Sequence, residues 1–142
     1  MGSHDRVRLM NVLGGAPDEH TMTEAERCAY RLSNSERGLA KGRLWLITLV
    51  QMTMPGVPCI YYGDEAGMEG YSDPANRAAF PWDNMDADAG DIYRNAISLR
   101  RLLGVFTSGD FRTEDSGSDD VLMFRRTLPD ESAVIIINRS LY

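Results

Sequence analysis

The sequence predicts an α/β fold over residues 1–104, followed by the first strands of an antiparallel β domain over residues 105–142. One observation is the succession of an apolar helix, a tight Pro/Gly turn and a buried strand, which is half of a repeating α/β unit. The other is a change after Gly104 to short strand-like runs separated by turn residues. Hydrophobic residues make up 43% and charged residues 25%, a composition typical of a folded globular chain.

Two helices are expected before residue 55. Thr21 and Glu24 have the spacing of a capping box, and apolar residues at steps of three and four predict a helix over residues 22–32. From Leu44 to Met52, apolar side chains lie nearly all round a second helix, which indicates burial on more than one side. The turn at 55–58 ends this helix, because proline cannot continue it.

The segment Cys59–Tyr62 is apolar without alternation, which is typical of a strand covered on both faces in a parallel sheet. From Gly63 to about Gly90 no periodic pattern follows, and a loop of that length is usually functional. In an α/β barrel the loops at the carboxyl ends of the strands build the active site, and this loop leaves a strand at that end. Its chemistry-bearing residues are Asp64, Glu65, Asp73, Arg77, Trp82 and Asp83.

The last third of the chain predicts one helix and then a meander. Residues 91–103 have one apolar helical face, and Gly104 is placed to cap its end. Strands are expected at Val105–Thr113, Val121–Leu128 and Ala133–Asn138. Three strands are few for an independent sandwich.

Charge and composition exclude several partners. The net charge is −6, so we expect no binding to nucleic acid or to an anionic membrane surface. The acidic run 114–120 lacks the spacing of a calcium loop and is expected to be a solvated turn. Cys28 and Cys59 fit no metal spacing and are expected to be small buried hydrophobic residues, so no metal site is predicted.

Three stretches carry a more specific signal: GSHDRVR at Gly2–Arg8, MPGVPCIYYGDEAGM at Met54–Met68 and DPANRAAFPWD at Asp73–Asp83. Together they resemble glycoside hydrolase family thirteen, the α-amylase family, and most of all its neopullulanase and cyclomaltodextrinase branch. The resemblance implies a partial (β/α)8 barrel. The first stretch would lie at the end of barrel strand seven, and the second would run through strand eight into its loop.

The resemblance also implies a reaction. This family hydrolyses or transfers α-glucosidic bonds with retention, which requires a carboxylate nucleophile and a carboxylic acid about 5–5.5 Å apart. In the family these are an Asp on strand four and a Glu on strand five. A third carboxylate stabilises the distorted sugar, and by resemblance this is Asp5. His4 would bind the same sugar, and Arg8 matches an arginine often found three residues after the Asp.

A length argument limits what these residues do alone. A complete barrel takes about 250 residues, and four residues precede Asp5 in this sequence. We therefore expect the C-terminal fragment of an α-glucan-active glycosidase, without nucleophile or acid and inactive by itself. A barrel fragment would bare a strand edge and an apolar helix face, so self-association is also expected.

The residues of the long loop have two interpretations each. Asp64 and Glu65 are adjacent and do not present both carboxylates to one bond, so we expect them to line the substrate cleft rather than to catalyse. Trp82 could stack on a sugar ring or anchor its loop. Arg77 could bind substrate hydroxyls or pair with Asp73, and the pairing is favoured.

The expected partner is therefore an α-glucan or maltodextrin. No cofactor is expected, although calcium is possible in a longer parent protein. The absence of a disulfide framework favours a cytoplasmic location. The alternative is a non-catalytic module that binds carbohydrate weakly or serves association. Which α-glucan is used, and whether the reaction is hydrolysis or transfer, stays open at this stage.

Overall fold

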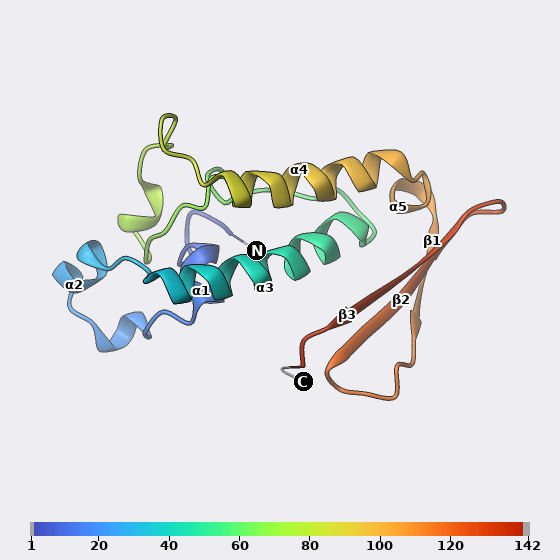
Figure 1. Cartoon of the computed structure of the whole chain (residues 1–142), viewed down its shortest axis with the longest axis horizontal. Helices are drawn as coiled ribbons and strands as arrows, with labels where there is room; N and C mark the ends of the chain where they lie inside the picture. Colours follow the sequence, from blue (N-terminus) through green and yellow to red (C-terminus); the bar gives the residue numbers. More distant parts are fainter. Residues whose placement is uncertain (1, 141–142) are drawn as a thin grey trace. The chain divides into compact units, whose positions relative to one another are not determined.

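A computed structural model of the chain describes residues 2–140 (Figure 1). The packed chain divides into two compact units. Unit 1 comprises Met1–Trp45 and Cys59–Arg94, and unit 2 comprises Leu46–Pro58 and Asn95–Tyr142. The expected domain boundary between residues 104 and 105 remains a prediction.

Unit 1 begins with short helices: α1 (Leu9–Gly14), a 3-10 turn η1 (Glu19–Thr21) and α2 (Glu24–Ala29). A capping box starts α2, because the Thr23 hydroxyl accepts from the Glu26 amide and the Glu26 carboxylate accepts from the Thr23 amide at 2.7 Å. The box predicted at Thr21 and Glu24 is therefore wrong by two residues. Both pairs have the same spacing of three, so spacing alone does not select between them.

The long helix α3 (Asn34–Thr53) begins with a second reciprocal cap. The Ser33 amide donates to the Glu36 carboxylate at 2.7 Å, and the Glu36 amide donates to the Ser33 hydroxyl at 3.3 Å. This cap starts α3 ten residues before the apolar run that predicted the second helix at Leu44. Leu44 is buried, but Trp45 is 41% exposed, so the expectation of burial nearly all round this helix is only partly met.

The strand predicted at Cys59–Tyr62 does not form, which corrects the sequence-based expectation. A strand exists only through ladder hydrogen bonds to a neighbour. Within residues 2–140 the ladders join only β1 (Asp110–Glu114), β2 (Val121–Thr127) and β3 (Ser132–Asn138). The segment 59–62 is irregular and leads into turns instead.

The long loop predicted after Gly63 is present. It contains one 3-10 turn, η2 (Ala75–Arg77), and ends where α4 (Ala87–Leu102) begins. The helix starts four residues earlier than predicted because the Asp86 carboxylate accepts from the Ala89 amide at 3.1 Å and caps the helix.

Gly104 does not cap α4 in the left-handed conformation. Its φ is −58°, and it begins the short helix α5 (Val105–Ser108). The strand predicted at Val105–Thr113 is therefore wrong in its first half, and β1 starts only at Asp110. The Val105 amide, which a strand would pair with a neighbour, donates instead to the Glu131 carboxylate at 3.0 Å.

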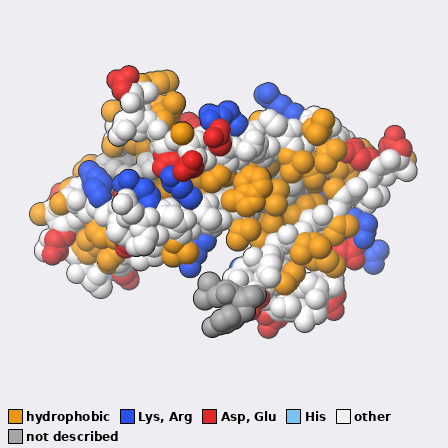
Figure 2. Space-filling view, in the orientation of Figure 1, with side chains coloured by type: hydrophobic (Ala, Val, Ile, Leu, Met, Phe, Trp, Pro, Cys, Tyr) orange, Lys and Arg blue, Asp and Glu red, His pale blue; other side chains and the backbone are white. Residues whose placement is uncertain are grey.

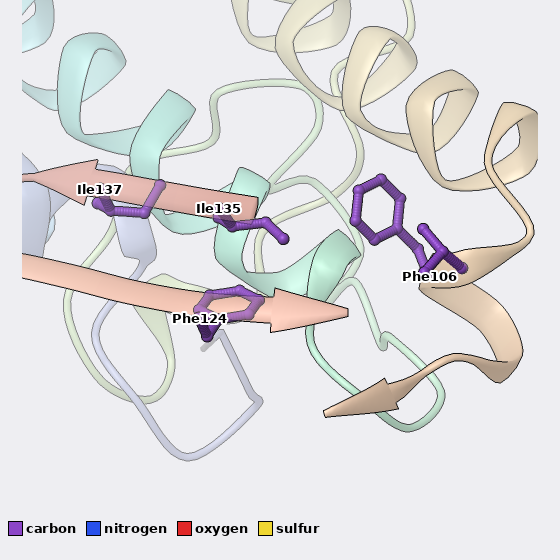
Figure 3. Packing of buried hydrophobic residues seen from close by; sticks show 5 residues of the cluster. Phe106, Phe124, Ile135 and Ile137 are labelled. Carbon is purple, nitrogen blue, oxygen red and sulfur yellow. The ribbon is translucent and has the colours of Figure 1, made fainter. Parts of the chain in front are cut away.

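The predicted antiparallel meander is confirmed in unit 2, where β2 lies between β1 and β3. Phe124 stands opposite Ile135 in the register of β2 and β3, and both are buried. With Ile137 and Phe106 they form the hydrophobic core of this unit (Figure 3). The core therefore joins one face of the sheet to α5.

A buried arginine completes the interior of unit 2. Arg126 on β2 is 1% exposed, and its guanidinium donates to the carbonyls of Thr53 at 2.6 Å, Phe106 at 3.2 Å and Gly109 at 2.7 Å. These carbonyls replace the water that the charge loses on burial.

One further expectation, the burial of the two cysteines, can be compared with residues 2–140. Cys28 and Cys59 are both exposed, so their predicted burial is wrong. No group of three or more His, Cys, Asp or Glu side chains in this range is placed to hold a metal ion. None of the helices described here is both long and apolar enough to cross a membrane.

Candidate functional site

His4 and Asp5 form an exposed pair at the start of unit 1. The His4 Nε2 lies 3.1 Å from the Asp5 Oδ2, and the two side chains are 63% and 70% exposed. The chain turns here, since the amides of Asp5 and Arg6 both donate to Ser3, one to its hydroxyl and one to its carbonyl, each at 3.3 Å. The turn presents the Asp5 carboxylate to solvent.

Asn76 fixes this turn from the long loop. Its side chain is fully buried, and Nδ2 donates to the carbonyls of His4 and Arg6, each at 2.8 Å. Both hydrogen bonds flank Asp5, so Asn76 restrains the backbone on either side of the candidate carboxylate. Asn76 is not among the residues predicted from the sequence. Its only signal there is its place inside the stretch Asp73–Asp83.

Arg77 follows Asn76 and connects two carboxylates. Its Nη2 lies 3.3 Å from the Asp73 Oδ2 and 3.8 Å from the Asp5 Oδ1. The predicted pairing of Arg77 with Asp73 is confirmed. The structure adds the approach to Asp5, which brings the first and third motif stretches together around one carboxylate.

Arg8 and Asp64 form a second, buried pair. The guanidinium lies 4.5 Å from the ring centre of Tyr61 and 4.6 Å from that of Tyr62, and it donates to the Tyr62 carbonyl. Its Nη1 lies 3.7 Å from the Asp64 Oδ1, and both side chains are almost fully buried. Burial raises the pKa of Asp64 to about 6, although the positive charge of Arg8 acts in the opposite direction.

Gly2 passes directly beside this pair. A Cβ at position 2 would clash with the Asp64 carboxylate, so the close approach requires glycine there. Glu65 is partly buried, and its Oε2 is a buried atom without a hydrogen-bond partner in the part of the chain described. The placement of Asp64 and Glu65 thus differs from that of Asp5, whose carboxylate faces solvent.

Trp82 is the most exposed aromatic residue of the candidate set, with 78% of its surface accessible. Its ring centre lies 4.6 Å from that of Phe80 at an interplanar angle of 51°. The indole therefore packs against Phe80 and leaves a large apolar surface exposed. The contacts that join Asp5 to Arg77 do not include Trp82.

The structure thus sorts the seven predicted site residues into groups. His4, Asp5 and Arg77 are in direct contact, Arg8 and Asp64 form the buried pair, and Glu65 and Trp82 belong to neither group. A separate surface hollow of unit 1, lined among others by Arg37, Glu69 and Asp86, contains none of the seven. Its Arg37, Glu69 and Asp86 are in ion pairs, since Arg37 bonds Glu69 at 2.6 Å and Lys41 bonds Asp86 at 2.7 Å.

An exposed carboxylate beside an imidazole and a guanidinium can bind sugar hydroxyls and stabilise positive charge. An oxocarbenium-like transition state develops such a charge at the anomeric carbon. A retaining glycosidase reaction also needs a nucleophile and an acid about 5–5.5 Å apart. The buried Asp64 and the partly buried Glu65 do not present such a pair to solvent.

Comparison with known proteins gives a family. Residues 1–101 match the family model described as alpha amylase, catalytic domain. An amylopullulanase from Thermoanaerobacterium thermosulfurigenes is 35% identical over 99% of this chain and 8% of its own length. A cyclomaltodextrinase from Geobacillus thermopakistaniensis (strain MAS1) is 33% identical over 99% of this chain and 20% of its own length. The chain therefore spans a small part of the curated relatives it matches.

Solved structures agree in fold. The cyclic α-maltosyl-(1→6)-maltose hydrolase from Arthrobacter globiformis superposes with a TM-score of 0.73 at 23% identity, over 98% of this chain and 26% of that one. The acarbose-soaked debranching enzyme from Nostoc punctiforme gives 0.67 at 28% identity, over 96% of this chain and 23% of that one. These matches confirm the predicted fold class, a part of the (β/α)8 catalytic barrel followed by the beginning of an antiparallel β domain. The chain belongs to the α-amylase family of glycoside hydrolases, and residues 1–101 are part of its catalytic domain.

Proposed function

We propose that this chain forms one wall of the active site of a retaining α-glucan hydrolase, with Asp5 as the transition-state stabiliser. The observation that carries the proposal is the exposed Asp5 carboxylate on a turn that Asn76 clamps from both sides. A carboxylate held in this way is preorganised, so it does not have to reorient when the charge on the sugar develops.

In this proposal Asp5 acts mainly on the transition state. Its negative charge attracts the oxocarbenium-like ring more strongly than the neutral substrate, and such differential binding accelerates the reaction. His4, next to it, binds a hydroxyl of the same sugar. Arg77 holds Asp5 in position through its charge and contributes a second group at the edge of the site.

The other predicted residues form the wall around this group. The open indole surface of Trp82 suits the apolar face of a sugar ring. Arg8 and Asp64 support the wall from the interior of unit 1. Both are buried, so a substrate hydroxyl does not reach them without a rearrangement. Glu65 lies next to them and lines the wall with its partly buried carboxylate.

The substrate we propose is an α-glucan with α-1,4 or α-1,6 bonds, such as maltodextrin, pullulan or a cyclodextrin. Support comes from relatives described as amylopullulanase, cyclomaltodextrinase and neopullulanase. We further propose that the 142-residue chain binds such glucans weakly and does not hydrolyse them, because it presents one carboxylate where the retaining reaction needs three.

The test measures hydrolysis and binding with the 142-residue chain. Release of reducing sugar from maltodextrin and β-cyclodextrin is expected to stay at the level of the protein-free blank. Binding of β-cyclodextrin, followed by NMR titration, is expected to be weak, to decrease in Asp5→Asn and to disappear in Trp82→Ala. The matched control is Trp45→Phe, which alters the other tryptophan and is expected to bind as the wild type does.

Two results would contradict the proposal. Hydrolysis that Asp5→Asn abolishes would mean that carboxylates of this chain complete the reaction. Binding unchanged by both Asp5→Asn and Trp82→Ala would remove the proposed wall from the site and favour the alternative of an association module.

A further inference from the structure

The loop between η2 and α4 borders a surface hollow of unit 1 that the proposed site around Asp5 does not use. The hollow has a volume of about 370 Å³, and all of its lining residues lie between positions 31 and 86. Figure 2 shows hydrophobic side chains gathered on the loop that leads into α4. The volume is at the lower end of the range for small-ligand pockets, about 300–1,000 Å³.

Backbone contacts hold the walls of this hollow in place. The Asp86 amide donates to the Ala66 carbonyl at 3.0 Å. Beside it, a Cβ at Gly67 would lie 2.8 Å from the Cβ of Asp86, so this close approach requires glycine. On another wall, the Tyr62 hydroxyl donates to the Ala78 carbonyl at 2.9 Å. The hollow is therefore formed before any ligand binds, as most small-ligand sites are.

The lining carries both signs of charge, which favours a neutral ligand. Its charged residues are Arg31, Arg37, Glu69 and Asp86. Both carboxylates are already in ion pairs with cationic side chains, at 2.6 and 2.7 Å. An anion would be repelled by the carboxylates and a cation by the guanidinium groups. Hydroxyl groups can bind both kinds of side chain without adding a charge.

The lining also combines hydrogen-bond donors with apolar surface. Arg31 is exposed and donates through Nη1 to the carbonyls of Cys28 and Tyr30, at 3.0 and 2.6 Å. A guanidinium has five N–H donors, so others can reach a ligand. Asn84 is exposed and adds an amide, while Met85 is 52% exposed and adds apolar surface. A sugar matches this combination, because its ring has an apolar face and a rim of hydroxyl groups.

We infer that the hollow is a second glucan-binding site, which takes a short segment of an α-glucan chain whose neighbouring unit stacks on Trp82. In the sequence Trp82 stands between Pro81 and Asn84, which both line the hollow. Its indole is largely exposed and takes no part in the contact between Asp5 and Arg77. The inference rests on the proposed α-glucan substrate and adds a place where the chain is held away from Asp5.

NMR titration of the 142-residue chain with maltotriose tests the site through two separate sets of amide signals. The amides of Gly67 and Met85 are expected to shift as the hollow fills. Replacing both Arg31→Ala and Asn84→Ala removes donors from the lining and is expected to raise the Kd reported by these amides roughly tenfold. The same double variant is expected to leave the signals around Asp5 unchanged, and Asp5→Asn is expected to have the reverse effect.

The matched control is Arg94→Ala. Arg94 is an exposed arginine of unit 1 that pairs with Asp91 on α4 and does not line the hollow, so the variant is expected to bind as the wild type does. Amide spectra of each variant verify that it is folded.

Other outcomes overturn the inference. If maltotriose shifts the amides around Asp5 but none around the hollow, the second site does not exist. If the double variant binds as tightly as the wild type, the ligand occupies another surface. Equal shifts with inorganic phosphate would refute the selection of a neutral ligand. A response at the hollow without one around Asp5 would instead contradict the proposed function and leave the second site supported.

Discussion

The pH dependence of stability should reveal the buried carboxyl of Asp64. Burial raises its pKa to about 6 from an ordinary value of 3.8. Below both values the folded and unfolded chains hold the proton equally. Between them the unfolded chain releases the proton while the folded chain keeps it, so the unfolded state gains stability as the pH rises. Above about pH 6 both states are ionised, and the free energy of unfolding does not fall further.

The magnitude follows from the size of the shift. A difference of about two pKa units corresponds to about 3 kcal/mol, the amount by which Asp64 lowers the free energy of unfolding at neutral pH relative to acid pH. Asn at this position cannot ionise, so the unfolding free energy of Asp64→Asn should not decrease in this way between acid and neutral pH. The attraction of Arg8 is already contained in this shift, since it acts on the pKa of Asp64 against burial.

Urea unfolding of wild type and Asp64→Asn, at about pH 4 and about pH 7, measures the effect. The quantity of interest is the difference in unfolding free energy between the two proteins at each pH. Groups present in both proteins cancel in this difference, including Glu36, whose pKa is lowered by hydrogen bonds from Ser33. The variant is expected to gain about 2.5 kcal/mol relative to the wild type between these two pH values, less than the full amount because the unfolded carboxyl is already partly ionised at pH 4.

A control separates burial from the loss of a negative charge. Asp83→Asn removes an exposed carboxylate of the same loop. Its unfolding free energy is expected to change with pH almost as that of the wild type does. If the difference between wild type and Asp64→Asn were the same at both pH values, Asp64 would not be a desolvated carboxyl. The buried pair with Arg8 would then be placed incorrectly.

Three further changes have expected magnitudes. Asn76→Ala removes the donor to the His4 and Arg6 carbonyls, so we expect a loss of about 2–3 kcal/mol in urea unfolding and faster amide hydrogen exchange around Asp5. Phe124→Ala opens a cavity in the core of unit 2, with an expected loss of about 3–5 kcal/mol in the same assay. Thr23→Ala breaks the capping box of α2 and is expected to cost about 1 kcal/mol, visible as a lower urea midpoint without loss of sugar binding.

Local patterns account for the features that the sequence predicted correctly. The meander follows from short strand-like runs between turns, and α4 follows from one apolar helical face. The pairing of Asp73 with Arg77 also depends on neighbouring residues. Each of these features is determined within about ten residues, where side-chain spacing is informative.

The errors occur where a distant segment decides the local structure. Val105–Ser108 has the composition of a strand, yet it is helical while the Val105 amide is bound by Glu131 from beyond β2. Cys59–Tyr62 also has strand composition, and no ladder within the described residues includes it. β propensity describes a fit to a neighbouring strand, so it fails where that neighbour is not present beside the segment.

Asn76 could not be predicted for the same reason. A polar residue in a loop is usually solvated, and its two acceptors lie at the other end of unit 1 in sequence. Only the folded arrangement shows that one amide group bonds both carbonyls beside Asp5.

The two buried arginines show where the chain tolerates unsatisfied polar groups. Arg126 directs its guanidinium at three carbonyls, whereas Arg8 leaves Nε and Nη2 without a hydrogen-bond partner among the described residues. The buried polar atoms that lack partners there also include one oxygen each of Asp64, Glu65 and Asn76. Of these residues, Asn76 bonds the Asp5 turn directly, whereas Arg8 and Asp64 form the separate buried pair. Unsatisfied buried groups cost stability, so the surroundings of Arg8 are a costly part of the interior of unit 1. Arg126 has the opposite character, because its hydrogen bonds are made within the core of unit 2, and its role is accordingly structural.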